Sequence, residues 1–94
     1  AVEDAGLIDN TIIIVTSDNG PTWAGGVDHE FFDSNGPLRG LKGSIYEGGI
    51  RVPMVVSWPG KIPTGSTNTV VSGFQDLLPT LVELAGGTPP AGSG

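Results

Sequence analysis

The fold is decided by residues 11–20, which read Thr11-Ile12-Ile13-Ile14-Val15-Thr16-Ser17-Asp18-Asn19-Gly20. The first six residues are all β-branched and their centre is apolar without alternation, which is typical of a strand covered on both faces, as in a parallel sheet. Asp18 and Asn19 follow this strand, and ligands collect beyond the carboxyl ends of strands in open α/β sheets. Because a carboxylate and an amide oxygen suit Ca²⁺ or Mg²⁺, these residues are candidate metal ligands.

Two donors do not complete a metal site. Calcium takes roughly 6 to 8 oxygen ligands, so most of the shell would come from elsewhere in the protein. The residues also allow a simpler interpretation, because Asp-Asn-Gly is a common turn sequence whose side chains satisfy nearby backbone groups. From residues 18–20 alone, the turn is favoured over the metal site.

The composition describes a small, acidic, globular chain. Its 94 residues are 37% hydrophobic and 15% charged, which fits at most one small domain and differs from a disordered tail. The net charge of −6 opposes binding to a phosphate backbone, so we expect no nucleic-acid partner. No stretch approaches the roughly 18 apolar residues of a membrane span. The absence of cysteine excludes disulfides and zinc–thiolate sites within these residues.

Three further segments predict regular structure. Residues 2–7 resemble the tail of a helix, and residues 52–58 form a second, nearly continuous apolar strand. Apolar residues at helical spacing predict a helix over residues 75–86. Asp76 is the expected N-cap of this helix, and Gly86 followed by Gly87 is the expected stop.

These segments predict the α/β class, as part of a mostly parallel sheet with flanking helices. We expect Trp58 and the apolar residues of 77–85 to form the core. One complete helix and two or three strands cannot cover both faces of such a sheet, so the fold is incomplete in this chain. Residues 1–94 are therefore expected to be a fragment of a larger catalytic domain.

A glycine-rich loop over residues 36–53 is the second chemical feature. Its glycines let the backbone approach a ligand closely, and Lys42 offers a compact positive charge. Beside a divalent cation, this loop suits an oxyanion such as sulfate or phosphate, and Lys42 would stabilise charge that develops during ester cleavage. The pattern is not a phosphate-binding P-loop, and a solvated surface lysine is the alternative interpretation.

Several motifs, taken in order over about residues 10–86, resemble the sulfatase family, arylsulfatase type, of the alkaline phosphatase superfamily. They read Asn10-Thr11-Ile12-Ile13-Ile14-Val15-Thr16-Ser17-Asp18-Asn19-Gly20, Pro37-Leu38-Arg39-Gly40-Leu41-Lys42-Gly43, Tyr46-Glu47-Gly48-Gly49-Ile50-Arg51-Val52-Pro53, Trp58-Pro59-Gly60 and Asp76-Leu77-Leu78-Pro79-Thr80-Leu81. The resemblance implies an alkaline phosphatase-like sandwich, of which this chain covers the C-terminal part of the catalytic domain.

The resemblance also implies a sulfuric ester hydrolase with specific residue roles. Asp18 and Asn19 match the residues that ligate the active-site calcium in this family, with Mg²⁺ as the alternative ion. Lys42 matches the lysine that contacts the sulfate of the substrate and helps to stabilise charge. The family's formylglycine nucleophile arises from a Cys/Ser-x-Pro-x-Arg motif, which this chain lacks. The nucleophile is therefore expected in the rest of the parent protein, and the isolated chain is expected to be inactive.

The implied partners are a sulfated small molecule or carbohydrate and the remainder of the parent catalytic domain. The compartment is left open, although the family is typically periplasmic, secreted or lysosomal. One alternative function is a phosphodiesterase or phosphonate hydrolase of the same superfamily. A second is a non-catalytic scaffold or anion-binding module. The nucleophile motif of the parent would distinguish these functions.

Other residues of the long loop are expected to have structural or peripheral roles. Arg39 and Arg51 are expected to pin the loop by pairing with carboxylates such as Glu47. His29 is the sole histidine and lies outside the matching motifs, so a position on the surface or at a pocket rim is expected. The loop's large aromatic residues either line a substrate pocket or form a local cluster. They are Trp23, Phe31 and Phe32.

Overall fold

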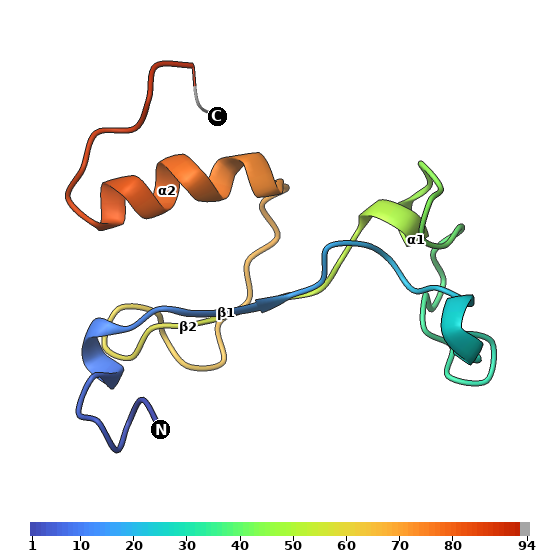
Figure 1. The fold of residues 1–94 in the computed structure, drawn as a ribbon, viewed down its shortest axis with the longest axis horizontal. Coiled ribbons are helices and arrows are strands. Elements are labelled where there is room, and N and C mark those ends of the chain that lie inside the picture. The colour runs from blue at the N-terminus through green and yellow to red at the C-terminus, as the bar shows by residue number, and fades with distance from the viewer. Residues whose placement is uncertain (93–94) are drawn as a thin grey trace.

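A computed structural model describes residues 1–92, so Ser93 and Gly94 of the expected fragment lie outside the described residues. The helices and strands are β1 (Ile13–Thr16), α1 (Glu47–Ile50), β2 (Met54–Ser57) and α2 (Leu77–Leu84), with 3₁₀ turns at Ile8–Asn10, Ala24–Gly26 and Phe74–Asp76. Figure 1 shows the two strands in the middle of the molecule, with α1 and the long loop beyond one end of them. No helix in this part of the chain is long and apolar enough to cross a membrane.

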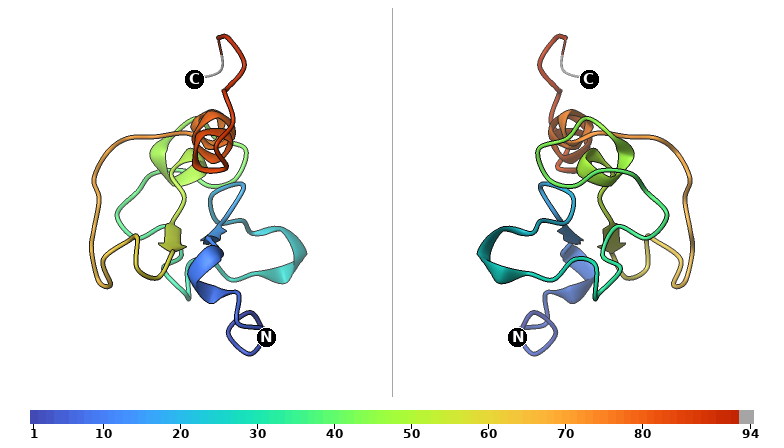
Figure 2. Two further views of the ribbon diagram at one scale, coloured as in Figure 1. Left: turned by 90° about the vertical axis from the view of Figure 1, so that its left-hand side faces the viewer. Right: turned by 90° about the vertical axis from the view of Figure 1, so that its right-hand side faces the viewer.

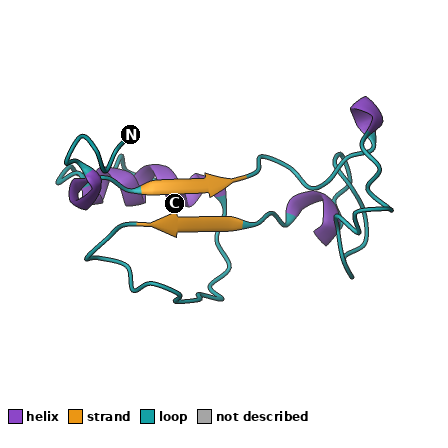
Figure 3. Cartoon of the chain, turned by 90° about the horizontal axis from the view of Figure 1, so that it is seen from below, coloured by secondary structure: helices purple, strands orange, loops and turns teal. Residues whose placement is uncertain are grey.

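The two strands form an antiparallel sheet, as their opposed arrows show in Figure 3. Thr16 pairs with Met54, and the Thr16 hydroxyl donates a hydrogen bond of 2.8 Å to the carbonyl of Pro53. The parallel arrangement expected for this sheet is therefore wrong for the two strands described. A parallel pair needs a crossover that returns the chain to the start of the first strand, whereas residues 17–53 fold over the end of β1.

Helix α2 lies over one face of the sheet and is set apart from the strands (Figures 1 and 2). Ile14, Val56 and Trp58 from the sheet side and Leu81 from α2 line an apolar hollow between the two layers. No hydrophobic side chain is buried within residues 1–92, so the expectation that Trp58 and residues 77–85 form a core is wrong for this part of the chain. Two short strands and one helix offer too little surface to enclose one another.

The start of α2 differs from the predicted one. The helix begins at Leu77 because Phe74–Asp76 form a separate 3₁₀ turn before it. Asp76 precedes α2 as expected, but its carboxylate makes no capping bond to this helix. It instead accepts a hydrogen bond of 2.7 Å from the backbone amide of Gly73. The carboxylate therefore stabilises the 3₁₀ turn.

The end of α2 follows its sequence signal. Gly86 has a φ of 80°, its amide donates to the carbonyl of Glu83 at 2.9 Å, and the Gly87 amide donates to the carbonyl of Val82 at 2.9 Å. These bonds form a Schellman motif, in which a residue of positive φ ends the helix. The predicted stop is confirmed.

Residues 2–7 form hydrogen-bonded turns and not a regular helix. Their hydrogen bonds have the same pattern as those at the end of α2. The Leu7 amide donates to the carbonyl of Val2 at 3.1 Å, and the Gly6 amide donates to the carbonyl of Glu3 at 2.8 Å. Gly6 has a φ of 68°. The segment thus has the hydrogen bonds of a helix C-terminus, in agreement with the sequence pattern.

We expect Gly86→Ala to lower the free energy of unfolding of the protein by about 1–2 kcal/mol, because a Cβ is disfavoured at positive φ. An added Cβ would meet nothing within 4 Å, so the backbone alone accounts for this cost. Gly86→Asn should lose less, since asparagine tolerates this conformation better. Urea unfolding of the three proteins measures the difference, and equal stability of wild type and Gly86→Ala would contradict the left-handed cap.

Candidate functional site

The candidate site lies at one end of the sheet. Because β1 and β2 are antiparallel, the residues that follow β1 and those that precede β2 emerge at the same end. Asp18 and Asn19 belong to the first group, and α1 with the rest of the loop 36–53 belongs to the second (Figure 1). The sheet therefore brings the two chemical features of the sequence to one place.

Three glycines join these two segments. Gly20, Gly48 and Gly49 are the buried residues of the described chain. The Gly20 amide donates a hydrogen bond of 3.0 Å to the carbonyl of Gly49. A Cβ on Gly20 would collide with the carbonyl oxygen of Gly48, so the two backbones are in direct contact. We call this contact the glycine junction.

The loop that carries Lys42 is attached to the same turn. The Lys42 amide donates to the carbonyl of Pro21 at 2.8 Å, and the Gly48 amide donates to the carbonyl of Arg39 at 2.8 Å. The side chains of Asp18 and Lys42 are exposed. Within residues 1–92 neither has a hydrogen-bond or ion-pair partner, so both charged groups are available to a ligand.

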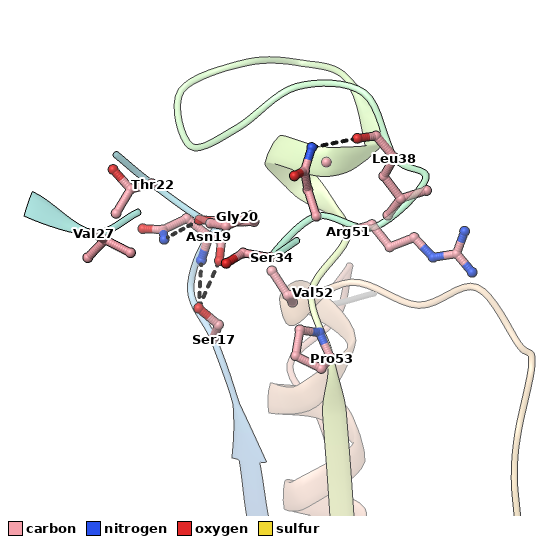
Figure 4. Close-up of a pocket in the computed structure, with 13 residues that line it drawn as sticks. Ser17, Asn19, Gly20, Thr22, Val27, Ser34, Leu38, Arg51, Val52 and Pro53 are labelled. Carbon is pink, nitrogen blue, oxygen red and sulfur yellow. Dashed lines mark hydrogen bonds between the residues drawn. The ribbon is translucent and has the colours of Figure 1, made fainter. Parts of the chain in front are cut away.

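Ser17 shapes the turn that holds the candidate metal ligands. Its hydroxyl donates to the carbonyl of Asn19 at 2.8 Å, and Asn19 Nδ2 donates to the carbonyl of Gly20 at 3.0 Å (Figure 4). In the described chain, Asn19 Oδ1 and the Asp18 carboxylate accept no hydrogen bond. Two unpaired hard oxygen donors on neighbouring residues fit part of a Ca²⁺ or Mg²⁺ shell.

The donor set is small. Residues 1–92 contain no group of three or more histidine, cysteine, aspartate or glutamate side chains that could hold a metal ion. Since calcium takes about 6 to 8 oxygen ligands, Asp18 and Asn19 fit an incomplete shell. The remaining ligands of such a site would have to come from outside this part of the chain.

An open hollow of about 690 Å³ lies beside the turn, between the end of β1 and the start of β2 (Figure 4). Its lining includes Ser17, Asn19, Val27, Asn35, Arg51 and Pro53. Asp18 and Lys42 are not among its lining residues in the described chain. The hollow therefore borders the Asn19 side of the candidate metal turn.

The two arginines of the glycine-rich loop are engaged within the chain. Arg51 Nη1 lies 3.6 Å from Glu47 Oε2, which confirms the expected pairing, although such an exposed pair contributes little stability. Arg39 instead stacks its guanidinium over the ring of Tyr46, 3.8 Å from the ring centre. Both contacts hold the loop around α1.

The aromatic residues of the long loop do not line this hollow. Trp23, Phe31 and Phe32 are 71%, 78% and 68% exposed. The rings of Phe31 and Phe32 pack edge to face with centres 5.0 Å apart, so these two form the local pair that the sequence allowed. His29 is half-buried, and its carbonyl accepts a hydrogen bond of 3.0 Å from the amide of Ser34.

Sequence reasoning missed Ser17 and Asn35. Asn35 Nδ2 donates to the carbonyls of Leu38 at 2.7 Å and Gly40 at 3.4 Å, which fixes the chain just before Lys42. A signal was available for both residues. Serine and asparagine beside turn residues commonly bond to nearby backbone groups.

A turn with two hard oxygen donors and a loop with an unpaired lysine thus meet through glycines at one end of the sheet within residues 1–92. The chain belongs to the sulfatase family, because the Sulfatase family model matches residues 1–87. Family membership implies an alkaline phosphatase-like fold for the domain, to which the described residues contribute a two-stranded sheet and helices.

Several curated sulfatases are similar to this chain. Human arylsulfatase A is 44% identical over 94 residues, which cover 96% of this chain and 17% of that protein. A sulfatase of Formosa agariphila is 41% identical over 91 residues, covering 92% of this chain and 14% of that protein. N-acetylgalactosamine-6-sulfatase of the dog is 36% identical over 90 residues, with 96% and 17% covered. The chain thus spans a small part of the length of these relatives.

Ser44 gives a test of the packing around the glycine junction, because its Oγ is buried without a hydrogen-bond partner in the described chain. We expect Ser44→Ala to keep the free energy of unfolding of the full-length protein or raise it by about 1 kcal/mol, since an unsatisfied buried hydroxyl costs about 1–3 kcal/mol. The control is Ser66→Ala, which removes the hydrogen bond of 2.7 Å from the Ser66 hydroxyl to the Pro63 carbonyl and should lose about 1 kcal/mol. Thermal unfolding measures both, and a larger loss for Ser44→Ala would contradict the unpaired hydroxyl.

Proposed function

We propose that this chain supplies part of the metal site and one sulfate contact of a sulfuric ester hydrolase. The observation that carries the proposal is the glycine junction, which ties the turn of Asp18 and Asn19 to the loop of Lys42 at one end of the sheet. Membership of the sulfatase family supports the reaction class. The substrate is proposed to be a sulfated aryl compound or carbohydrate.

Asp18 and Asn19 would hold Ca²⁺, with Mg²⁺ as the alternative ion, through the two oxygen donors that stay unpaired within residues 1–92. When bound, such a dication neutralises negative charge that develops on the ester. The other ligands are proposed to come from the remainder of the parent protein. Most of the length of human arylsulfatase A lies outside the 17% that this chain matches, which supports a source of ligands beyond residues 1–94.

Lys42 would bind the sulfate group as a compact cation. In the transition state of ester cleavage, its charge would stabilise oxygens that become more negative. The formylglycine nucleophile of the family would lie outside this chain, which has no cysteine and no Cys/Ser-x-Pro-x-Arg motif. Residues 1–94 alone are therefore proposed to be inactive.

The metal role is tested by Asp18→Ala in the full-length protein. Loss of one ligand carboxylate should weaken calcium binding by about 100-fold or more, since even groups behind the ligands are worth about 10–100-fold. Calorimetry with calcium measures the affinity, and turnover of an aryl sulfate is followed in parallel. Asp9→Ala, which removes another exposed carboxylate, is the matched control. Unchanged calcium affinity in Asp18→Ala would rule out the metal role.

The sulfate contact is tested by Lys42→Ala in the same protein. We expect kcat/KM for an aryl sulfate to fall by about 100- to 1,000-fold, by analogy with the loss of one donor to a developing oxyanion. Lys61→Ala is the matched control, because Lys61 is the other lysine of the chain. If Lys42→Ala and Lys61→Ala had the same kcat/KM, Lys42 would be an ordinary surface lysine.

A further inference from the structure

We propose that Gly20, Gly48 and Gly49 are positioning residues that make ligand binding at the Asp18–Asn19 turn depend on the geometry of the Lys42 loop. This inference rests on the proposed function and goes beyond it, because it assigns a role to residues whose side chains offer no ligand atoms. The role follows from the close contact of two backbones at the glycine junction.

The junction is the most enclosed part of the described chain. No hydrophobic side chain is buried within residues 1–92, whereas Gly20, Gly48 and Gly49 are buried. The contact is made by main-chain atoms, including the hydrogen bond of 3.0 Å from the Gly20 amide to the Gly49 carbonyl. Main-chain contact of this kind fixes the relative position of two segments without occupying their side chains.

Close approach is the reason for glycine at these positions. None of the three has a positive φ, so their backbone conformation would also suit other residues. A Cβ on Gly48 would lie 2.7 Å from the carbonyl oxygen of Arg39, and one on Gly49 would lie 2.6 Å from that of Leu41. A side chain at Gly48 or Gly49 would therefore push α1 away from the part of the loop that carries Lys42, whereas a side chain at Gly20 would push the Asp18–Asn19 turn away from Gly48.

A displacement at the junction would move both candidate ligand groups. Asp18 is two residues before Gly20, and the carbonyl of Pro21, one residue after it, accepts the hydrogen bond of 2.8 Å from the Lys42 amide. In the proposed function the metal and Lys42 act on the same sulfate group, so their separation matters. A shift of about 1 Å in such a site can cost about 100-fold in rate.

The test is Gly48→Ala in the full-length protein, compared with Gly65→Ala. The control adds a methyl group where nothing lies within 4 Å, at a glycine with a φ of 74°, so it strains the backbone far from the candidate site. We expect Gly48→Ala to raise the calcium Kd at least about tenfold and to lower kcat/KM for an aryl sulfate about 100-fold. Gly65→Ala should keep both values.

A folded Gly48→Ala protein with the calcium Kd and kcat/KM of the wild type would overturn the proposal. The proposal would also be overturned if Gly48→Ala lost as much stability as Gly65→Ala but bound calcium like the wild type. Gly48 would then be needed only for folding. A wild-type protein that neither binds calcium nor cleaves the sulfate ester would instead refute the proposed function. The two failures are therefore distinguishable.

Hydrogen exchange of the wild-type protein provides the second measurement if Gly48→Ala does not fold. With calcium present, we expect the amides of Gly48 and Lys42 to exchange at least about tenfold more slowly than after chelation, although neither residue is a proposed metal ligand. The amide of Ala85, which donates to Leu81 at the end of α2, is the control and should not change. Equal exchange at Gly48 and Lys42 with and without calcium would overturn the proposal.

Discussion

The main-chain hydrogen bond from Gly20 to Gly49 is the contact on which the arrangement of the site depends. It closes residues 20–49 into a loop, and ordering a loop of this length has an entropic cost that one hydrogen bond of about 1 kcal/mol does not offset. The bonds from Lys42 to Pro21 and from Gly48 to Arg39 add to it. Several cooperating backbone contacts are therefore needed to hold the loop.

The antiparallel sheet determines where that loop can close. Thr16 pairs with Met54, so the chain leaves β1 and returns to β2 at the same end of the sheet. The rule for parallel α/β sheets predicts the candidate metal turn beyond the carboxyl end of a strand. The two described strands are antiparallel, yet the turn lies where the rule predicts. A turn that follows a strand lies at the end of that strand, whichever way the neighbouring strand runs.

Patterns of neighbouring residues predicted both strands and the end of α2, but they did not predict contacts between residues far apart in the sequence. Both strands and the stop of α2 at Gly86 follow from residues next to one another in the chain, and each strand lies within its predicted range. The short helix α1 (Glu47–Ile50) was missed because two of its four residues are glycines, which disfavour helices. The glycine junction was missed for a different reason: backbone contact between distant residues leaves no periodic pattern of side chains. Asp18, Asn19 and Lys42 were singled out by their chemistry and by family resemblance.

Asp18, Asn19 and Lys42 are suited to binding ligands because the backbone, and not their side chains, holds the site together. Main-chain bonds and close glycine contact hold the two segments together, so no charged side chain is needed for this task. The other cations of the loop are engaged, since Arg51 approaches Glu47 and Arg39 lies over Tyr46. Lys42 has no such partner within residues 1–92. A framework built from backbone contacts thus leaves one cation and two hard oxygen donors unpaired at the same end of the sheet within residues 1–92, where in the proposed function the oxygens would hold a metal ion and the lysine an oxyanion.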